Sequence, residues 1–259
     1  MAKTALITGA SSGLGREFAI QLSKRGFKVI IAARRRERLE ELAQSLPGES
    51  RVVVCDLSDR EECRRLYDEV RSERIGVLVN NAGFGKLGSF TDIPLEDELS
   101  MIDTNVTAVH ILTKLFLKDF TAADRGYILN VASSAGLMPG GPLMAAYYAT
   151  KAYVTSLTSA ISEELRQQDS RVSISALCPG PVDTEFNEVA NAHFSVKPMS
   201  AADCARAGLD GLFARKLIIV PEQQMKLAAA ASNLVPRRVT LSVTGKLQSA
   251  KSTASDSEK

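Results

Sequence analysis

A glycine-rich turn near the amino end of the chain places the strongest constraint on its fold. Residues 5–8 are apolar or β-prone, and Gly9, Gly13 and Gly15 follow before an amphipathic helical pattern begins. This order predicts a β-strand, a tight turn and the start of a helix. Glycine accepts backbone angles that are closed to other residues, and it lets a phosphate approach the main chain at a helix N-terminus. Alone, the turn fits a pyrophosphate site and a ligand-free βα connection equally well.

The rest of the chain alternates short apolar runs with helical patterns. Further strands are expected at residues 27–33, 51–55, 75–79, 127–131, 172–177 and 217–220. Helices are expected between them, including two long ones at about 96–118 and 143–168. Strands that alternate with helices build a parallel sheet with right-handed crossovers. We therefore predict an α/β fold of the Rossmann type, a doubly wound, seven-stranded parallel sheet with helices on both faces.

The length and composition of the chain allow one substantial hydrophobic core. The chain has 259 residues, 45% of them hydrophobic, and α/β folds of this length are often a single domain. We expect residues 1–248 to form one Rossmann domain with a substrate loop at about 185–200 and a helical segment at about 222–247. Residues 249–259 are small, polar and charged, which predicts a disordered tail.

Charge and cysteine content exclude several classes of function. Lys and Arg total 32 against 30 Asp and Glu, and a net charge of +2 gives no reason to expect a nucleic-acid partner. The four cysteines show no metal-ligand spacing, so we expect reduced thiols and no metal. The first strand is expected almost at Met1, without room for a signal peptide, and no apolar run is long enough for a transmembrane span. These features predict a cytoplasmic protein.

Polar and glycine-rich segments directly follow most of the expected strands. They are Gly9 to Gly15, Ala33-Arg34, Asp56, Asn80 to Gly83, Ser133-Ser134 and Pro179-Gly180. The carboxyl ends of parallel strands share one edge of a sheet, and doubly wound folds bind ligands at that edge, near the point where the winding reverses. We therefore expect these segments to form one ligand site.

A tyrosine and a lysine four residues apart carry the clearest chemistry. Tyr147 and Lys151 share one face of the expected helix 143–168. A nearby ammonium favours phenolate, so we expect Lys151 to lower the pKa of Tyr147 and fit it for proton exchange with a substrate. Tyr148 and Tyr153 have no lysine at this spacing. Taken alone, such a pair is also common on plain helix surfaces.

Two serines follow the strand expected at 127–131. A hydroxyl of Ser133 or Ser134 could donate a hydrogen bond to a substrate carbonyl oxygen, or simply cap the turn that follows. Serine hydrolysis is a poor interpretation because the chain lacks GxSxG. Its two histidines, His110 and His193, also stand in no hydrolase-like arrangement.

Together, these motifs resemble the compact branch of the short-chain dehydrogenase/reductase family. They are Thr8-Gly9-x-x-x-Gly13-x-Gly15, Asn80-Asn81-Ala82-Gly83, the serine pair, Tyr147-x-x-x-Lys151 and Pro179-Gly180, in the family's order over residues 4–185. Their joint occurrence is far more specific than any single motif. The resemblance implies an oxidoreductase that transfers hydride between nicotinamide C4 and a carbonyl or secondary alcohol.

The resemblance also implies the catalytic roles. The family's serine lies thirteen residues before its tyrosine, which selects Ser134 over Ser133 as the residue that polarises the substrate oxygen. Tyr147 supplies the proton, and Lys151 also holds the nicotinamide ribose. The family's supporting asparagine matches Asn105, with a bound water that relays protons to the lysine. From the residues alone, Asn105 could equally bend its helix by bonding to nearby backbone.

The resemblance further implies a set of cofactor-binding residues. They are Gly9, Ser11, Ser12, Gly13, Leu14, Gly15, Arg34, Asp56, Leu57, Asn81, Ala82, Gly83, Tyr147, Lys151, Pro179, Gly180, Val182 and Thr184. Asp56 and Leu57 are expected at the adenine ring, and residues 179–184 near the nicotinamide. Two alternatives stay open: Asp56 could cap the helix that begins near Asp59, and Asn80 and Asn81 could chiefly tie neighbouring strands together.

The end of the second expected strand predicts the choice of dinucleotide. NAD-binding Rossmann proteins usually place an acid there for the ribose diol, whereas an arginine accommodates a 2′-phosphate. Here Ala33 takes the acid's place and Arg34 follows, which predicts NADP(H). We expect the next three arginines, Arg35, Arg36 and Arg38, to be the solvated start of a helix.

Substrate and partners are less constrained. Phe186, Phe194, Met138, Leu143 and Met144 favour an apolar small-molecule substrate. A homodimer or homotetramer is expected through the long helices at 96–118 and 143–168. The basic, apolar segment 222–247 is expected to pack on the core or a second subunit, with association to a membrane surface as a weaker alternative. The alternative functions are a non-catalytic NADP(H)-binding regulator and a family-related epimerase or dehydratase.

Overall fold

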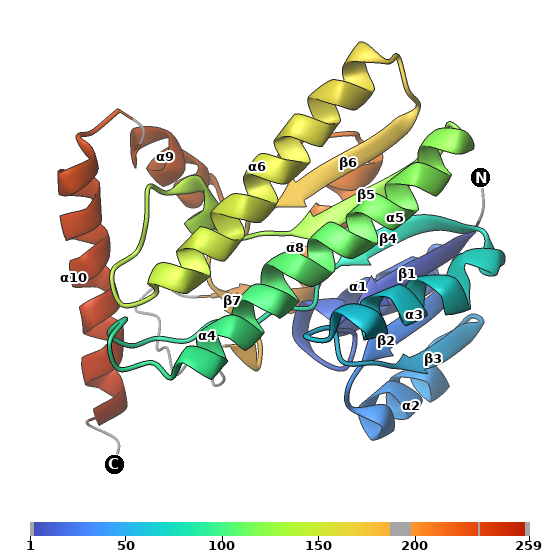
Figure 1. Cartoon of the computed structure of the whole chain (residues 1–259), viewed down its shortest axis with the longest axis horizontal. Coiled ribbons are helices and arrows are strands. Elements are labelled where there is room, and N and C mark those ends of the chain that lie inside the picture. Colours follow the sequence, from blue (N-terminus) through green and yellow to red (C-terminus); the bar gives the residue numbers. More distant parts are fainter. Residues whose placement is uncertain (1–2, 187–197, 233, 257–259) are drawn as a thin grey trace.

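The computed structural model describes residues 3–186, 198–232 and 234–256. Its centre is a parallel sheet with strand order β3-β2-β1-β4-β5-β6-β9 (Figure 1). The strands are β1 Thr4–Thr8, β2 Lys28–Ala33, β3 Ser50–Val54, β4 Ile75–Asn80, β5 Gly126–Val131, β6 Val172–Leu177 and β9 Ile218–Ile219. This sheet confirms the predicted seven-stranded, doubly wound Rossmann fold.

The winding of the sheet reverses between β1 and β4. In register, Ile7 of β1 pairs with Ile31 of β2 on one side and with Val79 of β4 on the other. The chain first builds outward through β2 and β3, then returns past β1 to β4 and continues the other way. A reversal of this kind opens a crevice at the carboxyl ends of the strands.

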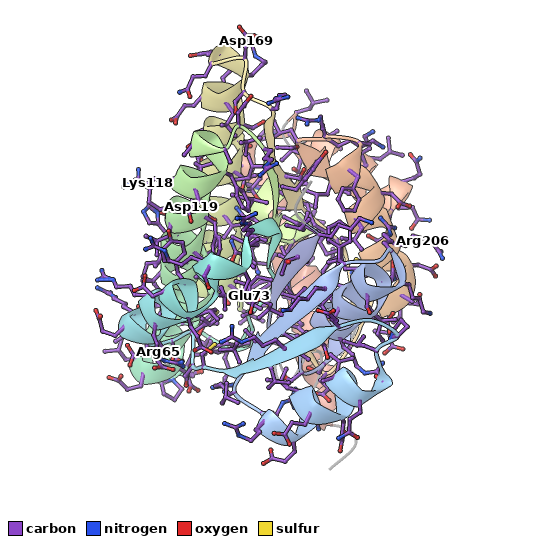
Figure 2. All side chains as sticks on the ribbon, turned by 90° about the vertical axis from the view of Figure 1, so that its right-hand side faces the viewer. Arg65, Glu73, Lys118, Asp119, Asp169 and Arg206 are labelled. Atoms are coloured by element: carbon purple, nitrogen blue, oxygen red, sulfur yellow. The ribbon has the colours of Figure 1, made fainter. Side chains whose placement is uncertain are left out.

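Helices cover both faces of the sheet and bury a separate apolar cluster on each. The α-helices are α1 Gly13–Lys24, α2 Arg36–Ser45, α3 Arg60–Val70, α4 Leu95–Ile102, α5 Ala108–Ala122, α6 Ala145–Gln167, α8 Ala201–Phe213, α9 Gln223–Ser232 and α10 Arg237–Asp256. Successive strand residues point to opposite faces: Ile7 packs with Phe18 of α1, and Leu6 joins the cluster that holds Phe116 of α5. The exposed charged side chains, such as those of Arg65, Lys118 and Arg206, lie on the outside (Figure 2).

Short elements complete the chain and mostly lie near the crevice. They are the 3-10 turns η1 Arg71–Glu73 and η3 Ser134–Leu137, the π-helical turn η2 Asp103–Thr107, and a small two-stranded sheet of β7 Val182–Asp183 and β8 Met199–Ser200. The predicted long helix at 96–118 is therefore divided into α4, η2 and α5. Such π turns inside helices frequently mark functional sites, and this one holds Asn105.

The carboxyl-terminal segment forms two helices at one end of the molecule, where Figure 1 draws α9 and α10 in red. They are separated around Pro236, which cannot continue a helix from the preceding turn. Residues 249–256, predicted as the start of a disordered tail, instead continue α10. Between Lys246 and Asp256 there is no glycine or proline to stop the helix, and residues 257–259 lie outside the described part of the chain.

Candidate active site

A cavity of about 770 Å³ opens at the carboxyl ends of the strands, on the crevice between β1 and β4. The predicted cofactor residues that line it are Gly9, Ser11, Ser12, Gly13, Leu14, Arg34, Asp56, Leu57, Asn81, Ala82, Gly83, Tyr147, Lys151, Pro179, Gly180, Val182 and Thr184. Ser133 and Ser134 also line it, whereas Gly15 and Asn105 are not among the lining residues. The residues predicted from the sequence thus form much of the wall of this cavity.

The glycine turn is packed so closely that side chains are excluded. A Cβ on Gly15 would lie 2.2 Å from the carbonyl oxygen of Gly9, and Gly13, at φ +50°, lies against Thr184. Gly15 is therefore required by the packing of the turn itself, while Gly13 brings the turn next to the segment after β6. Helix α1 begins here without a side-chain cap. Its first N–H groups and positive dipole end fit an anionic pyrophosphate.

Asn81 fastens the loop after β4 to the glycine turn. Its side-chain amide donates to the carbonyl of Thr8 at 2.9 Å, and its backbone N–H donates to the Thr8 hydroxyl at 2.9 Å. The same hydroxyl accepts from the N–H of Ala82 at 3.1 Å. These bonds realise the strand-tying alternative for Asn81, and they hold Ala82 and Gly83 on the cavity wall.

Ser133, rather than Ser134, meets the catalytic tyrosine predicted from the sequence. Tyr147 on α6 is only 9% exposed, and its hydroxyl shares a hydrogen bond with the side chain of Ser133. Ser133 is the extended residue that follows β5, whereas Ser134 begins η3 and donates its backbone N–H to Pro179 at 2.8 Å. Counting back from the tyrosine could not locate the bend that separates these two neighbours, and the selection of Ser134 is revised accordingly.

Burial sets the acid–base properties of Tyr147 and Lys151. Burial raises the pKa of Tyr147 to about 12, although the hydrogen bond with Ser133 opposes the change. Burial also lowers the pKa of Lys151 to about 8. The pKa of Tyr147 therefore moves in the opposite direction from the one expected from Lys151, because desolvation by burial is the largest effect on the phenol and the hydrogen bond with Ser133 opposes it only in part. The Lys151 Nζ donates to the carbonyl of Val131 at 2.9 Å and lies 5.8 Å from the centre of the Tyr147 ring.

Asn105 lies fully buried behind the cavity wall. Its side-chain oxygen accepts from the N–H of Phe84 at 3.0 Å, and its amide donates to the Phe84 carbonyl at 2.8 Å and the Thr150 hydroxyl at 3.2 Å. A Cβ on Gly83 would lie 2.8 Å from the Asn105 oxygen and 3.4 Å from the Lys151 Nζ. Asn105 therefore fixes the Gly83–Phe84 backbone close to Lys151, and it bonds to the backbone of a different segment from its own helix.

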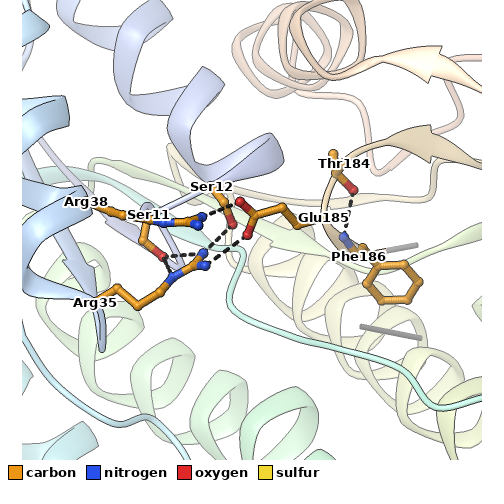
Figure 3. A network of polar contacts seen from close by, with 7 residues as sticks. All are labelled: Ser11, Ser12, Arg35, Arg38, Thr184, Glu185 and Phe186. Atoms are coloured by element: carbon orange, nitrogen blue, oxygen red, sulfur yellow. Dashed lines mark hydrogen bonds and ion pairs between the residues drawn. The ribbon is translucent and has the colours of Figure 1, made fainter. Parts of the chain in front are cut away.

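The arginines after β2 are arranged differently from the sequence prediction. Arg34 is exposed, with its guanidinium 3.9 Å from the carboxylate of Asp56. Arg35 instead donates to the hydroxyls of Ser11 and Ser12 on the glycine turn, at 3.1 and 2.8 Å (Figure 3). Arg36 faces solvent and pairs with Glu40 at 3.6 Å, as expected for the start of a helix.

A carboxylate from the far side of the cavity completes this cluster. Glu185 accepts from Arg35 at 3.0 Å and is also paired with Arg38 (Figure 3). Although partial burial raises it, the pKa of Glu185 stays below its ordinary value because Arg38 and Arg35 donate to the carboxylate. Arg35 and Arg38 are therefore not a merely solvated helix start. Their partner lies 150 and 147 residues away, so local patterns could not identify it.

The expected adenine side of the cavity is formed by Asp56 and Leu57. Asp56 accepts from the backbone N–H and the hydroxyl of Ser58, at 3.0 and 2.8 Å, in a local turn. The residue that caps α3 is Asp59, which accepts from the N–H of Glu61 at 2.8 Å. Asp56 is therefore free of the capping role that was left open for it.

The other end of the cavity is largely apolar. Its lining there comes from loops and from the carboxyl-terminal helices: Phe84, Met138, Met144, Tyr148, Phe186, Met225, Ala228 and Leu247. Phe186 packs against Tyr147, with ring centres 5.4 Å apart. Leu143 is absent from this lining, while Phe194 and His193 lie outside the described residues. Among the described residues, no cluster of histidine, cysteine or carboxylate side chains is placed to hold a metal ion.

The fold and the cavity together define a Rossmann-type protein with a groove for a dinucleotide. The family model described as short chain dehydrogenase matches residues 3–194, and the chain therefore belongs to this family, as the motifs predicted. The cavity fits the family's dinucleotide, because an uncapped helix end, glycines without room for side chains, and arginines share one wall.

Sequence comparison with individual proteins supports the same family. The chain is 34% identical over 240 residues to the NADP-dependent 3-hydroxy acid dehydrogenase of Schizosaccharomyces pombe, covering 85% of this chain and 90% of that one. It is 32% identical over 202 residues to the very-long-chain 3-oxoacyl-CoA reductase of Anas platyrhynchos, covering 73% of this chain but only 63% of the duck protein.

Solved structures agree on the fold. A short-chain dehydrogenase from Sphingobium yanoikuyae in complex with NADPH is 28% identical, with a TM-score of 0.79 and coverage of 89% and 94% of the two chains. A short-chain dehydrogenase/reductase from Burkholderia phymatum in complex with NAD is 25% identical, with a TM-score of 0.80 and coverage of 88% and 92%. Similar folds therefore bind either dinucleotide, and the choice depends on the residues of each chain.

Proposed function

We propose that this chain is an NADP(H)-dependent oxidoreductase that interconverts an apolar ketone and its secondary alcohol. One observation carries the proposal: Tyr147 and Ser133 share a hydrogen bond beside the buried Lys151, on the wall of the cavity that also holds the glycine turn. A proton donor, a hydrogen-bond donor and a dinucleotide-sized groove thus meet in one place.

The proposed mechanism assigns a separate task to each side chain. When bound, the nicotinamide supplies or accepts the hydride. Ser133 donates a hydrogen bond to the substrate oxygen, and Tyr147 delivers the proton to it during reduction. The raised pKa of Tyr147 keeps its proton in place at neutral pH, which suits reduction. We assign the serine role to Ser133 because it bonds to Tyr147.

Lys151 and Asn105 support this pair. Lys151 places an ammonium beside the Tyr147 ring, and we propose that it also holds the ribose of the nicotinamide half. Asn105 acts as a positioning residue through Phe84 and Thr150. The protein partners of the Asn105 side chain support this positioning role, and the water relay implied by the resemblance stays a prediction.

The arginines support NADP(H) as the dinucleotide. Ala33 ends β2 where an acid would hold a ribose diol, and Arg34 and Arg35 both line the cavity beside it. Arg35 already binds a carboxylate, that of Glu185, and a 2′-phosphate offers the same guanidinium a stronger anionic partner.

Side chains at the substrate end support an apolar substrate. Aromatic and methionine side chains from three loops and α9 line it, and Lys86 and Asp97, the charged pair at its rim, bind each other at 3.0 Å. Since two relatives are named for 3-hydroxy acid and 3-oxoacyl-CoA chemistry, β-oxoacyl compounds belong in any substrate panel.

A screen of cofactor consumption tests the proposal. Purified protein would be supplied with NADPH or NADH and with steroid ketones, aryl ketones, β-oxoacyl thioesters and sugars. We expect oxidation of NADPH with at least one apolar ketone, at a higher kcat/KM than with NADH. Cofactor binding without turnover of any carbonyl compound or alcohol would instead support the regulator.

We further propose that the protein is a cytoplasmic homodimer or homotetramer. Leu95, Leu99 and Ile102 on α4 and Tyr153 on α6 are exposed by 39 to 65%, on the helices expected to pair. The four cysteines are buried and free, as expected in a reducing compartment. Light scattering coupled to size-exclusion chromatography tests the assembly, and a strictly monomeric mass would contradict it.

A further inference from the structure

Helix α10 has its apolar and polar faces reversed. Thr240, Thr244 and Gln248 succeed one another at every fourth position and face inward, 9%, 8% and 3% exposed. Val239, Val243 and Leu247 form the neighbouring row, which we call the outer row, and they are 51%, 54% and 58% exposed. A surface helix ordinarily buries its apolar row and exposes its polar one. The outer row is therefore the face of α10 that needs an apolar surrounding.

The same region exposes further large apolar side chains. Leu227 on α9 is 71% exposed, and Leu234 and Val235 between the two helices are 88% and 41% exposed. Isolated apolar side chains on a surface need no explanation, but a group of six within 21 residues indicates an interaction site.

The charge of this segment identifies the chemistry of its partner. Residues 223–255 contain five basic residues and no acidic one, although bases and acids nearly balance over the whole chain. Arg238 and Lys246 are exposed and lie in the helical row next to the outer row. A second copy of this face would bring cation against cation, because such a contact is symmetric. A partner surface with an apolar interior and an anionic boundary would match both the apolar outer row and the basic row of Arg238 and Lys246.

The inner face of α10 closes the substrate end of the cavity. Thr244 and Gln248 line it, as does Leu247 of the outer row, and the Gln248 amide donates to the Tyr148 hydroxyl at 2.8 Å. Tyr148 directly follows Tyr147, so α10 is tied to the catalytic helix. Figure 1 shows α10 at the outer edge of the molecule, away from the sheet.

We propose that α9 and α10 seat the protein on an anionic membrane surface. The outer row enters the boundary between headgroups and acyl chains, while Arg238 and Lys246 contact lipid phosphates. The helices lie in the plane of the membrane, since none in the described ranges is long and apolar enough to cross a bilayer. The substrate end of the cavity then lies directly behind α10, close to the lipid, which gives an apolar substrate a short path; this corollary alone rests on the proposed function.

Vesicle sedimentation tests the proposal with the full-length protein. Vesicles of phosphatidylcholine alone are compared with vesicles that also contain phosphatidylserine, at low and high salt. We expect co-sedimentation with the anionic vesicles, weak binding to the neutral ones, and release by salt. Protein that stays in the supernatant with both kinds of vesicle would overturn the proposal.

Two double variants separate the contributions of the two rows. Arg238→Gln with Lys246→Gln should weaken partitioning into anionic vesicles by about tenfold or more, since each base near the surface contributes about 1 kcal/mol. Lys24→Gln with Lys216→Gln, which removes two exposed lysines elsewhere, should change it less than about twofold. Equal losses of vesicle binding in the two double variants would contradict membrane binding through α10.

The apolar variant distinguishes a membrane from a second subunit. Val239→Gln with Val243→Gln should abolish vesicle binding and leave the solution mass and NADPH binding unchanged. If this variant instead halves the mass of the protein in solution, the outer row is a subunit interface and the membrane proposal fails. Cofactor binding is an independent check that the variant is folded, so a failure of the membrane proposal remains distinct from a failure of the proposed enzyme.

Discussion

The two ends of the cavity are held in different ways. At the catalytic end, Tyr147, Lys151 and Asn105 are 9%, 5% and 0% exposed, and each is fixed by packing and hydrogen bonds between adjacent elements. At the arginine end, the side chains of Arg35 and Glu185 are 42% and 39% exposed and hold each other across the cavity. The first end is part of the core, whereas the second is an ion-pair cluster that a charged ligand can rearrange.

This difference determines which physical effect dominates at each end. Burial shifts the pKa of both proposed catalytic side chains, to about 12 for Tyr147 and about 8 for Lys151. Exposed ion pairs contribute little to stability, about 0–1 kcal/mol each, because water screens them. Changes at the catalytic end should therefore alter rate and folding, and changes at the arginine end should alter the choice of cofactor.

The largest effect is expected from removing the Tyr147 hydroxyl. Tyr147→Phe should lower kcat by about a thousandfold, because general acid catalysis contributes about 10² to 10⁴. NADPH affinity should change little, since the ring and its packing remain. Tyr153→Phe on the same helix is the matched control and should retain full activity. A Tyr147→Phe enzyme that reduces ketones at the rate of the unchanged protein would rule out the mechanism.

Lys151 should make folding stability depend on pH at the catalytic end. Its pKa in the folded state is about 8 against an ordinary 10.5, so the unfolded chain holds more protons between these values. Stability therefore rises as pH increases through this window. The free energy of unfolding of the native protein, minus that of Lys151→Met, should rise by about 2 kcal/mol from about pH 8 to about pH 10.

Urea denaturation of both proteins across this range measures the difference, and the subtraction cancels the buried thiols, which titrate in the same region. Lys118→Met, which removes an exposed lysine of α5, should give a flat difference. A flat difference for Lys151→Met as well would mean that Lys151 is solvated in the folded protein.

Arg35 should decide between the two cofactors. Arg35→Ala should raise the Kd for NADPH by about tenfold, which corresponds to about 1.4 kcal/mol, and leave the Kd for NADH within about twofold. Arg36→Ala, one residue away but paired with Glu40, is the matched control. If Arg35→Ala raises the Kd for both cofactors equally, the guanidinium maintains the conformation of the glycine turn and does not bind the 2′-phosphate.

The smallest effect is expected at Glu185. Its carboxylate competes with a 2′-phosphate for Arg35, so Glu185→Gln should lower the Kd for NADPH by about two- to threefold, within the range of an exposed ion pair. The Kd for NADH should not change. Glu40→Gln removes the partner of Arg36 and should affect neither cofactor. Weaker NADPH binding by Glu185→Gln would show that the carboxylate helps to hold the arginines for the phosphate.

The sequence was sufficient for the fold and for the part of the cavity wall formed at the strand ends. Alternating strands and helices predict the sheet, and strand ends place the glycine turn, Asn81 and Pro179 at one edge, because these features depend on local periodicity and topology. The helical spacing of Tyr147 and Lys151 is equally local.

Features that depend on tertiary packing could not be predicted from the sequence. A bend between Ser133 and Ser134 decides which hydroxyl reaches Tyr147, and residue spacing does not encode it. Desolvation reversed the expected pKa of Tyr147, since burial is a property of the whole fold. Glu185, which accepts a hydrogen bond from Arg35, lies 150 residues away in the sequence. Each of these depends on long-range packing rather than on a motif.

The most direct test of the proposed account is the affinity of the unchanged protein for the two reduced cofactors. The chain contains no tryptophan, so the fluorescence of NADPH and NADH themselves can report equilibrium binding. We predict that NADPH binds at least about tenfold more tightly than NADH, as expected for a 2′-phosphate held by guanidinium groups. Equal affinities, or tighter binding of NADH, would contradict the assignment of the arginine end and with it the proposed cofactor.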